Sequence, residues 1–293
     1  MNTAPIHHYE NFPVASLLCP PRLRPAIAAI YHFARTADDL ADEGDAGASE
    51  RLNDLAEFRS LLLSIWCQPD AAARSRWPHV FVPLAQQAEQ RDLPRQPFSD
   101  LLDAFEQDVR YTAAGQRYTN MAELLDYCRR SANPIGRLLL HLYGVDDAAA
   151  LRQSDAICTA LQLINFWQDL SVDLPRKRHY VPSDLLREYQ VDLDALAPGQ
   201  PSAAAQTMLE NLCHDARNLM LRGAPLALRL PGRIGWELRL VVQGGLRILD
   251  KLAQDHHQSW QRRPTVGVAD APRLLWRAWR MPAALRPHFS QTP

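Results

Sequence analysis

The sequence has no excess of charge of either sign and no long apolar run. Its 32 Lys and Arg residues are balanced by 33 Asp and Glu residues, which gives a formal net charge of −1. A chain without an overall positive field is not suited to gathering nucleic acid, so no nucleic-acid partner is expected. Nowhere do about 18 apolar residues follow one another, and the first residues, MNTAPIHHYENFP, lack the basic start and apolar run of a signal peptide. We therefore predict a cytoplasmic protein without a transmembrane segment.

Cysteine is scarce, and its spacing suits neither disulfides nor a metal site. The chain has five cysteines, widely separated and without a CxxC pair. An odd number of isolated cysteines argues against the disulfide framework of a small secreted domain and against the thiolate cluster of a zinc site. Reduced thiols are expected at Cys19, Cys67, Cys128, Cys158 and Cys213.

Strand signals are absent as well, whereas helical periodicity runs through most of the chain. No segment of alternating Val, Ile and Thr lies between turn residues, and there is no internal repeat. Pro25 suits the first turn of a helix that Gly44 ends. Further helices are expected after Ser49, after a cap at Ser99, and over Met121–Tyr143, Leu151–Asp173, 203–228 and 233–258. We predict one all-α domain over residues 1–293, with a core at about 9–258 and a short C-terminal helix and tail at 259–293.

Acidic residues are concentrated in RTADDLADEGD, at the end of the first expected helix. Asp38 and Asp42 are four residues apart and share a helix face, and Asp39 lies about 100° further round the axis. Two or three carboxylates can therefore point into one groove. Taken alone, such a cluster fits either a solvated helix face or a metal site.

A second set of polar residues lies on a helix that is otherwise apolar. In QLINFWQDLSVD, Asn165, Asp169 and Asp173 are spaced by four residues, which places them in a stripe about 12 Å long. Two carboxylates about 6 Å apart across a cavity would repel by nearly 3 kcal/mol at an effective dielectric constant of about 20. Oxygen ligands on two helices suit Mg²⁺, which completes its coordination with water and substrate phosphate. The two motifs together therefore predict a magnesium site that binds a diphosphate.

Both motifs resemble those of the squalene/phytoene synthase family. YHFARTADDLAD resembles the pattern Y-x-x-x-R-x-x-D-D-x-x-D, and QLINFWQDLSVDLPRKRHYVP resembles Q-x-x-N-x-x-x-D-x-x-x-D-x-x-x-x-R-x-Y. The intervening FEQDVRYTAAGQRYTNMAELLDYC also has the family's cadence, and the resemblance extends over about residues 9–252. It implies an isoprenoid synthase helical bundle with a central active-site cavity.

The resemblance also implies roles for individual residues. Arg35 and Arg178 would clamp the diphosphate, and Tyr31, Gln162 and Tyr180 match positions near it. Tyr127 matches a tyrosine at the reacting centre, and Tyr127, Tyr180 and Arg178 are the expected catalytic residues. For Tyr31 and Tyr127, ordinary core packing is the alternative. The residues expected to bind several Mg²⁺ ions, and through them the diphosphate, are Asp38, Asp39, Asp42, Asn165, Asp169 and Asp173.

Three departures from the family pattern bear on the reaction. Gln168 stands where condensing members usually have arginine, so one positive charge near the diphosphate is expected to be missing. Gly245 stands where a tyrosine is usual. We interpret it as a residue of the substrate-binding site whose lack of a side chain leaves room for the water molecule that reacts. Asn11 stands where condensing relatives tend to have serine. With these features the chain resembles the bacterial hydroxysqualene synthase branch of the hopanoid pathway, which converts presqualene diphosphate and water to hydroxysqualene and diphosphate. No NADPH is expected.

Alternative functions remain open at this stage. One is a squalene or phytoene synthase that condenses two prenyl diphosphates head to head, and another is a noncatalytic helical interaction protein, which the intact acidic motifs disfavour. Presqualene diphosphate would be handed over by a separate synthase. The segment RLLWRAWRMP suits either an interfacial helix in peripheral contact with the inner membrane face or a helix that caps the core.

Overall fold

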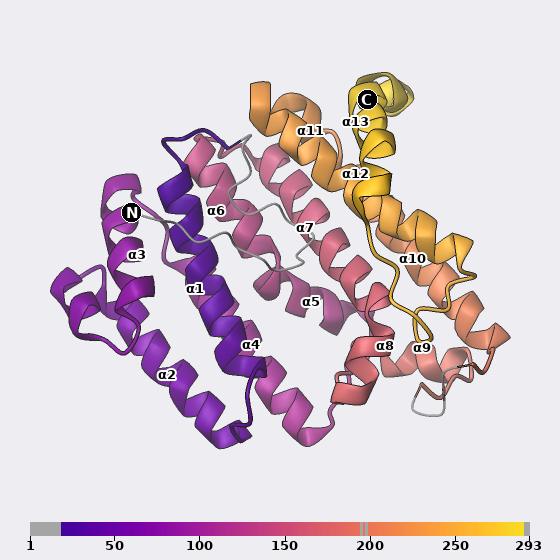
Figure 1. Ribbon diagram of the computed structural model, residues 1–293, viewed down its shortest axis with the longest axis horizontal. Helices are drawn as coiled ribbons and strands as arrows, with labels where there is room; N and C mark the ends of the chain where they lie inside the picture. The colour runs from indigo at the N-terminus through magenta and orange to yellow at the C-terminus, as the bar shows by residue number, and fades with distance from the viewer. Residues whose placement is uncertain (1–18, 194–195, 197–198, 290–293) are drawn as a thin grey trace.

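The computed structural model describes residues 19–193, 196 and 199–289, and among these it contains helices and no strand (Figure 1). The all-α prediction is therefore confirmed. The expected departure at Asn11 lies outside the described residues. The α-helices are α1 (Arg24–Asp42), α2 (Ala48–Ser64), α3 (Pro78–Arg91), α4 (Gln96–Ala114), α5 (Met121–Ser131), α6 (Asn133–Tyr143), α7 (Ala148–Gln168), α8 (Leu170–Asp173), α9 (Ser183–Glu188), α10 (Ala203–Gly223), α11 (Leu226–Arg229), α12 (Gly232–Gln254) and α13 (Ala271–Phe289). Three short 3₁₀ helices are η1 (Pro69–Arg74), η2 (Leu174–Arg176) and η3 (Val268–Asp270).

The first helix forms as its sequence predicts. Pro25 lies in the first turn of α1, and the helix buries one face through residues at three- and four-residue spacing, such as Ile30, Phe33 and Ala37. Its end is followed by Gly44, whose φ of +77° is a left-handed conformation that glycine adopts without strain. The acidic motif therefore lies in the last turns of a helix whose apolar face is fixed in the core.

Two hydrophobic clusters form the core. The first contains residues of the four helices α1, α2, α3 and α4. At its centre are four phenylalanines whose rings contact one another, Phe33, Phe58, Phe81 and Phe98. The second joins α5, α7, α10 and α12, with α10 packed along α7. Figure 1 shows α2 and α3 on one side of the molecule, α10, α12 and α13 on the other, and α1, α6 and α7 between them.

Three helix boundaries differ from the sequence-based expectation. Ser99 is not a cap, because α4 begins three residues earlier at Gln96. The helix expected over residues 121–143 is two helices separated at Ala132, since Pro134 has no N–H group to continue the hydrogen-bonding pattern of α5. The helix expected up to Asp173 is interrupted at Asp169, after which the N–H of Ser171 donates to the carbonyl oxygen of Ser259 at 3.1 Å.

The C-terminal segment forms a longer helix than expected. α13 has 19 residues and packs against α12, where Ala278 and Met281 are buried. Arg277 donates to a carboxylate oxygen of Asp250 at 2.6 Å. Among the helices of the described chain, none combines the length and apolar character that crossing a bilayer would require.

Candidate active site

Residues of both core clusters line a cavity of about 1040 Å³ whose two ends differ in character. The C-terminal halves of α1 and α7 contribute carboxylates and an amide at one end, including Asp38, Asp42 and Asn165. At the other end the lining is mainly apolar and comes from the first half of α1, the end of α6, α11 and the start of α12; it includes Ile27, Ile30, Leu139, Leu226, Leu230 and Ile234. The cavity can thus hold a molecule with a charged head and a long apolar chain.

The first acidic motif contributes two of its three predicted ligands to the cavity wall. Asp38 and Asp42 line the cavity, whereas Asp39 is not among the lining residues. Arg35 also lines the cavity and forms ion pairs with Asp38 at 3.1 Å and with Asp39 at 2.5 Å. The Arg35 guanidinium is therefore held by the carboxylates of Asp38 and Asp39, which lie on the next turn of the same helix.

The second motif keeps its expected register although the helix is interrupted. The N–H of Asp169 donates to the carbonyl oxygen of Asn165 at 2.9 Å, and the N–H of Asp173 donates to that of Asp169 at 2.8 Å. These two bonds keep the four-residue spacing across the break, and all three side chains line the cavity. Gln162, one turn earlier, lines it too. Burial, reinforced by the charge of Asp169, raises the pKa of Asp173 to about 7.

Arg178 links the two acidic motifs. Lys177 adopts a left-handed φ of +58° at the end of η2 and turns the chain back toward the cavity, where the N–H of Arg178 donates to the carbonyl oxygen of Asp173 at 3.0 Å. The Arg178 guanidinium is 2.8 Å from a carboxylate oxygen of Asp42 on the facing helix. The cation expected to clamp a diphosphate is therefore placed between the two rows of carboxylates.

Next to the polar end, aromatic rings form part of the wall. Tyr180 stacks on Phe166 with 3.9 Å between ring centroids, and Tyr127 packs beside both. These three residues line the cavity, as does Tyr31. Their π-faces could stabilise a developing positive charge on a substrate.

Asp108 is a cavity residue that the sequence analysis did not select. The Tyr127 hydroxyl donates to a carboxylate oxygen of Asp108 at 2.6 Å. Burial raises the pKa of this carboxyl to about 7, although the hydrogen bond from Tyr127 acts in the opposite direction. Its position between Phe105 and Val109, which also line the cavity, is the signal that could have revealed it, because an acid among inward-facing apolar residues is unusual.

Arg263 is a second cavity residue that the sequence did not reveal. It forms an ion pair with Asp169 at 2.5 Å, across 94 positions of sequence. Gln168 is buried, and its side-chain amide donates to the carbonyl oxygen of Pro264 at 2.6 Å, which fastens the segment that carries Arg263. Arg263 therefore brings a positive charge to this corner from another part of the chain, beside the neutral Gln168.

Gly245 lies in close helix packing and is not among the residues that line the cavity. A Cβ atom at this position would lie 2.9 Å from Met220 Cε, 3.1 Å from Leu161 Cδ2 and 3.3 Å from Ile164 Cδ1. The interpretation of Gly245 as open room for a water molecule is therefore wrong. Because Leu161 lines the cavity, bulk at position 245 would act on the cavity only by displacing that side chain.

The donor atoms at the polar end fit a hard cation in type. Carboxylate and amide oxygens are the ligands that Mg²⁺ prefers, and Asp38, Asp42, Asn165, Asp169 and Asp173 supply them. In the described part of the chain, no three His, Cys, Asp or Glu side chains lie close enough together to hold a metal ion as they stand. Arg35, Arg178 and Arg263 instead form ion pairs with Asp38, Asp42 and Asp169.

Comparisons with known proteins identify the family of this chain. The model of the family described as squalene/phytoene synthase matches residues 6–280. Hydroxysqualene synthase of Zymomonas mobilis is 34% identical over 281 residues, covering 92% of this chain and 90% of the relative. That of Sinorhizobium fredii is 33% identical over 249 residues, covering 84% and 80%. The crystal structure of squalene synthase HpnC from Alicyclobacillus acidocaldarius is similar with a TM-score of 0.74 and 33% identity, covering 85% of this chain and 90% of that one. This chain belongs to the squalene/phytoene synthase family.

Proposed function

We propose that this protein is a magnesium-dependent hydroxysqualene synthase, which converts presqualene diphosphate and water to hydroxysqualene and diphosphate. The observation that carries the proposal is the division of one cavity into an end with carboxylates and arginines and a long apolar end. The similarity to hydroxysqualene synthases over most of the chain supports the choice of reaction within the family.

The polar end is suited to ionising a diphosphate ester. Arg35, Arg178 and Arg263 can donate hydrogen bonds to diphosphate oxygens, whose negative charge grows as the C–O bond breaks. The predicted ligands Asp38, Asp42, Asn165, Asp169 and Asp173 would hold Mg²⁺. Tyr31 and Gln162 line the same cavity, and we assign them to contact with the diphosphate. Magnesium, when bound, supplies further positive charge to the leaving diphosphate.

The aromatic wall is suited to the second half of the reaction. The rings of Tyr127, Phe166 and Tyr180 can stabilise the carbocation that ionisation leaves. Water then forms a C–O bond to the cation and must lose one proton to give the alcohol. We assign the Tyr127 hydroxyl to accept this proton and to pass its own to the Asp108 carboxylate, to which it is hydrogen-bonded.

The test is incubation of the purified protein with Mg²⁺ and either presqualene diphosphate or farnesyl diphosphate, without NADPH. Mass spectrometry of the extracted lipids should show hydroxysqualene from presqualene diphosphate and no turnover of farnesyl diphosphate alone. Turnover of farnesyl diphosphate would instead show a condensing synthase and overturn the proposed substrate. Absence of turnover with both substrates would favour the noncatalytic alternative.

The contribution of Asp173 to the stability of the metal-free protein should fall as the pH rises from about 4 to about 7. The Asp173 carboxyl, with an ordinary pKa of 3.8 and a folded-state pKa of about 7, keeps its proton in the folded protein over a range in which the unfolded chain has released it. Asp173→Asn should remove this loss, so the variant should gain a few degrees of Tm over the native protein at about pH 8 but not at about pH 4.

Thermal unfolding followed by circular dichroism in EDTA measures this difference. Asp45→Asn, which changes an exposed acid outside the cavity, is the control and should leave the pH dependence unchanged. A Tm difference between Asp173→Asn and the native protein that does not vary with pH would contradict the prediction.

A further inference from the structure

The C-terminal helix α13 has two faces of opposite environment. Its inner face is fixed to α12 by buried Ala278 and Met281 and by the ion pair of Arg277 with Asp250. Its outer face carries the large apolar side chains of Trp276 and Trp279, which are 54% and 67% exposed, and of Leu275. The helix therefore caps the core, which is one of the two interpretations of its sequence. Its tryptophans do not take part in this packing, because they lie on the outer face.

The exposed side chains of α13 are those of a helix at a lipid–water interface. Leu275 and Trp279 are four residues apart and share a face, and Trp276 lies next to them. Arg273 and Arg280 are exposed among them, and the Arg280 guanidinium lies over the Trp276 ring, 5.2 Å from its centroid. Tryptophan combines an apolar ring with a polar N–H group, and arginine is attracted to anionic headgroups, so this combination favours the bilayer surface.

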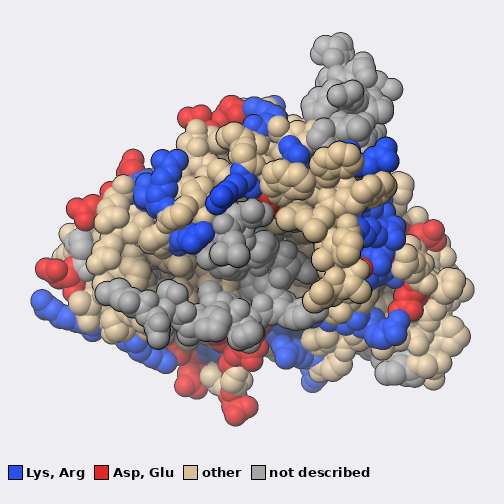
Figure 2. Space-filling model, turned by 45° about the horizontal axis from the view of Figure 1, so that its top comes forward, with Lys and Arg blue, Asp and Glu red and all other residues tan. Residues whose placement is uncertain are grey.

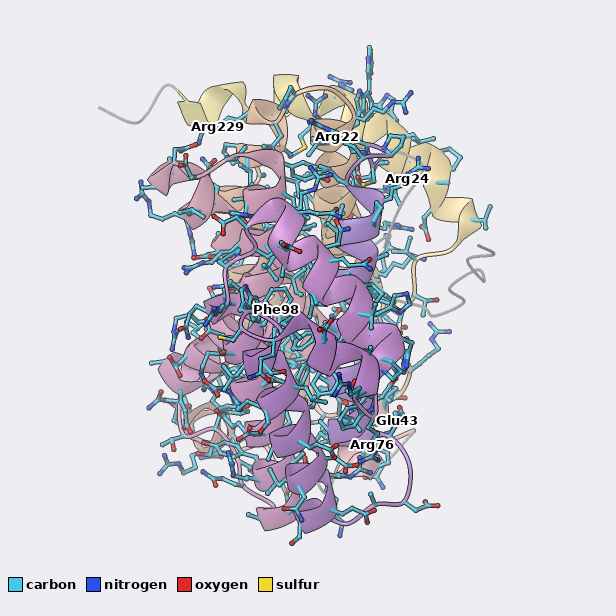
Figure 3. The ribbon with its side chains drawn as sticks, turned by 90° about the vertical axis from the view of Figure 1, so that its left-hand side faces the viewer. Arg22, Arg24, Glu43, Arg76, Phe98 and Arg229 are labelled. Atoms are coloured by element: carbon cyan, nitrogen blue, oxygen red, sulfur yellow. The ribbon has the colours of Figure 1, made fainter. Side chains whose placement is uncertain are left out.

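Several arginines lie at the same end of the molecule, one of which, Arg229, is paired with Asp147. Figure 3 places Arg22, Arg24 and Arg229 at the end where α13 lies and Glu43 toward the opposite end. Figure 2, in which this end is turned toward the viewer, shows Lys and Arg side chains at several places on the face, and Asp and Glu side chains mainly at its margins. Basic residues close to an anionic lipid surface are attracted to it.

This end also contains the apolar part of the cavity. Leu226 of α11, Leu230 just after α11 and Ile234 at the start of α12 line it. The carboxylates lie at the other end, because α1 and α7 both run from the apolar end to the polar end. An orientation with α13 on a membrane would therefore turn the apolar end of the cavity toward lipid and the acidic end toward water.

We propose that this protein binds peripherally to anionic phospholipid bilayers through the outer face of α13 and the arginines around it. Trp276 and Trp279 enter the headgroup region, and the helix lies along the membrane plane. The binding depends on the surface of α13 and not on the reaction in the cavity, so it can be tested independently of the proposed function.

Vesicle sedimentation of the full chain tests the proposal. The native protein should sediment with vesicles of phosphatidylcholine and phosphatidylglycerol and remain in solution with phosphatidylcholine alone. The double variant Trp276→Ser with Trp279→Ser should lose at least about tenfold in partitioning to the anionic vesicles, since binding scales with the apolar area buried. Arg280→Glu should weaken binding in the same direction.

The matched control is Leu63→Ser, which removes an exposed apolar side chain, 51% accessible, from α2. It should bind like the native protein. Lipids brominated on their acyl chains should quench native tryptophan fluorescence and should quench the double variant less, which separates insertion from purely electrostatic adsorption. Undiminished sedimentation of the double variant, or no binding of the native protein to anionic vesicles, would overturn the proposal. Circular dichroism checks that each variant is folded.

Discussion

Asp42→Asn should lower kcat/KM by at least about a hundredfold, whereas Asp39→Asn should lower it by less than about tenfold. The two residues belong to the same motif, but Asp42 lines the cavity and pairs with Arg178, while Asp39 is absent from the lining and pairs only with Arg35 among the contacts described. The loss for Asp42→Asn should be accompanied by a higher Mg²⁺ concentration for half-maximal activity, because the change removes a metal-binding oxygen.

Steady-state assays at several Mg²⁺ concentrations measure both effects. Asp39→Asn is itself the matched control, since it makes the same chemical change one turn or less away on the same helix. Equal losses for the two variants would show that Asp39 moves to bind the metal, as its motif position predicts.

Arg178→Ala should lower kcat by about 10²- to 10³-fold, the range found when a group that stabilises transition-state charge is removed. Its guanidinium is held between the two motifs by Asp42, where the departing diphosphate is expected. Arg178→Lys should recover part of the activity, because it restores the charge but not the planar pair of donors.

The neighbouring Lys177→Gln is the control for position and charge, because Lys177 is exposed and does not line the cavity. Single-turnover measurements with saturating substrate separate the chemical step from binding. A change in KM alone, with kcat preserved, would assign Arg178 to binding and not to ionisation of the diphosphate.

The helices and the two acidic motifs could be predicted because their signals are local. Helical spacing in α1 and the glycine after it fix where Asp38 and Asp42 lie, and hydrogen bonds across Asp169 preserve the spacing of the second motif. The separation of α5 from α6 also has a local signal, because Pro134 cannot continue the hydrogen-bonding pattern of α5.

The remaining features depend on contacts between distant segments. Nothing near Arg263 in the sequence indicates that it reaches Asp169. The segment that carries Arg263 is held there by a contact with a distant residue, the hydrogen bond from Gln168 to the Pro264 carbonyl oxygen. The interruption at Asp169 likewise depends on Ser259, which accepts the Ser171 N–H. The surroundings of Gly245 also depend on distant segments. A glycine indicates open space only when its neighbours leave that space empty, and here the side chains of Met220 and Leu161 fill the space beside Gly245.

The pairing of arginines with carboxylates has a thermodynamic consequence for binding. A divalent cation alone would take Asp42 and Asp169 from Arg178 and Arg263 and leave two guanidinium groups without partners. A diphosphate alone would take the arginines and leave the carboxylates to repel each other. Only both ligands together satisfy every charge, so each should increase the affinity of the site for the other by the same factor. Inorganic diphosphate should consequently bind this protein tightly when magnesium is present and only weakly when it is removed.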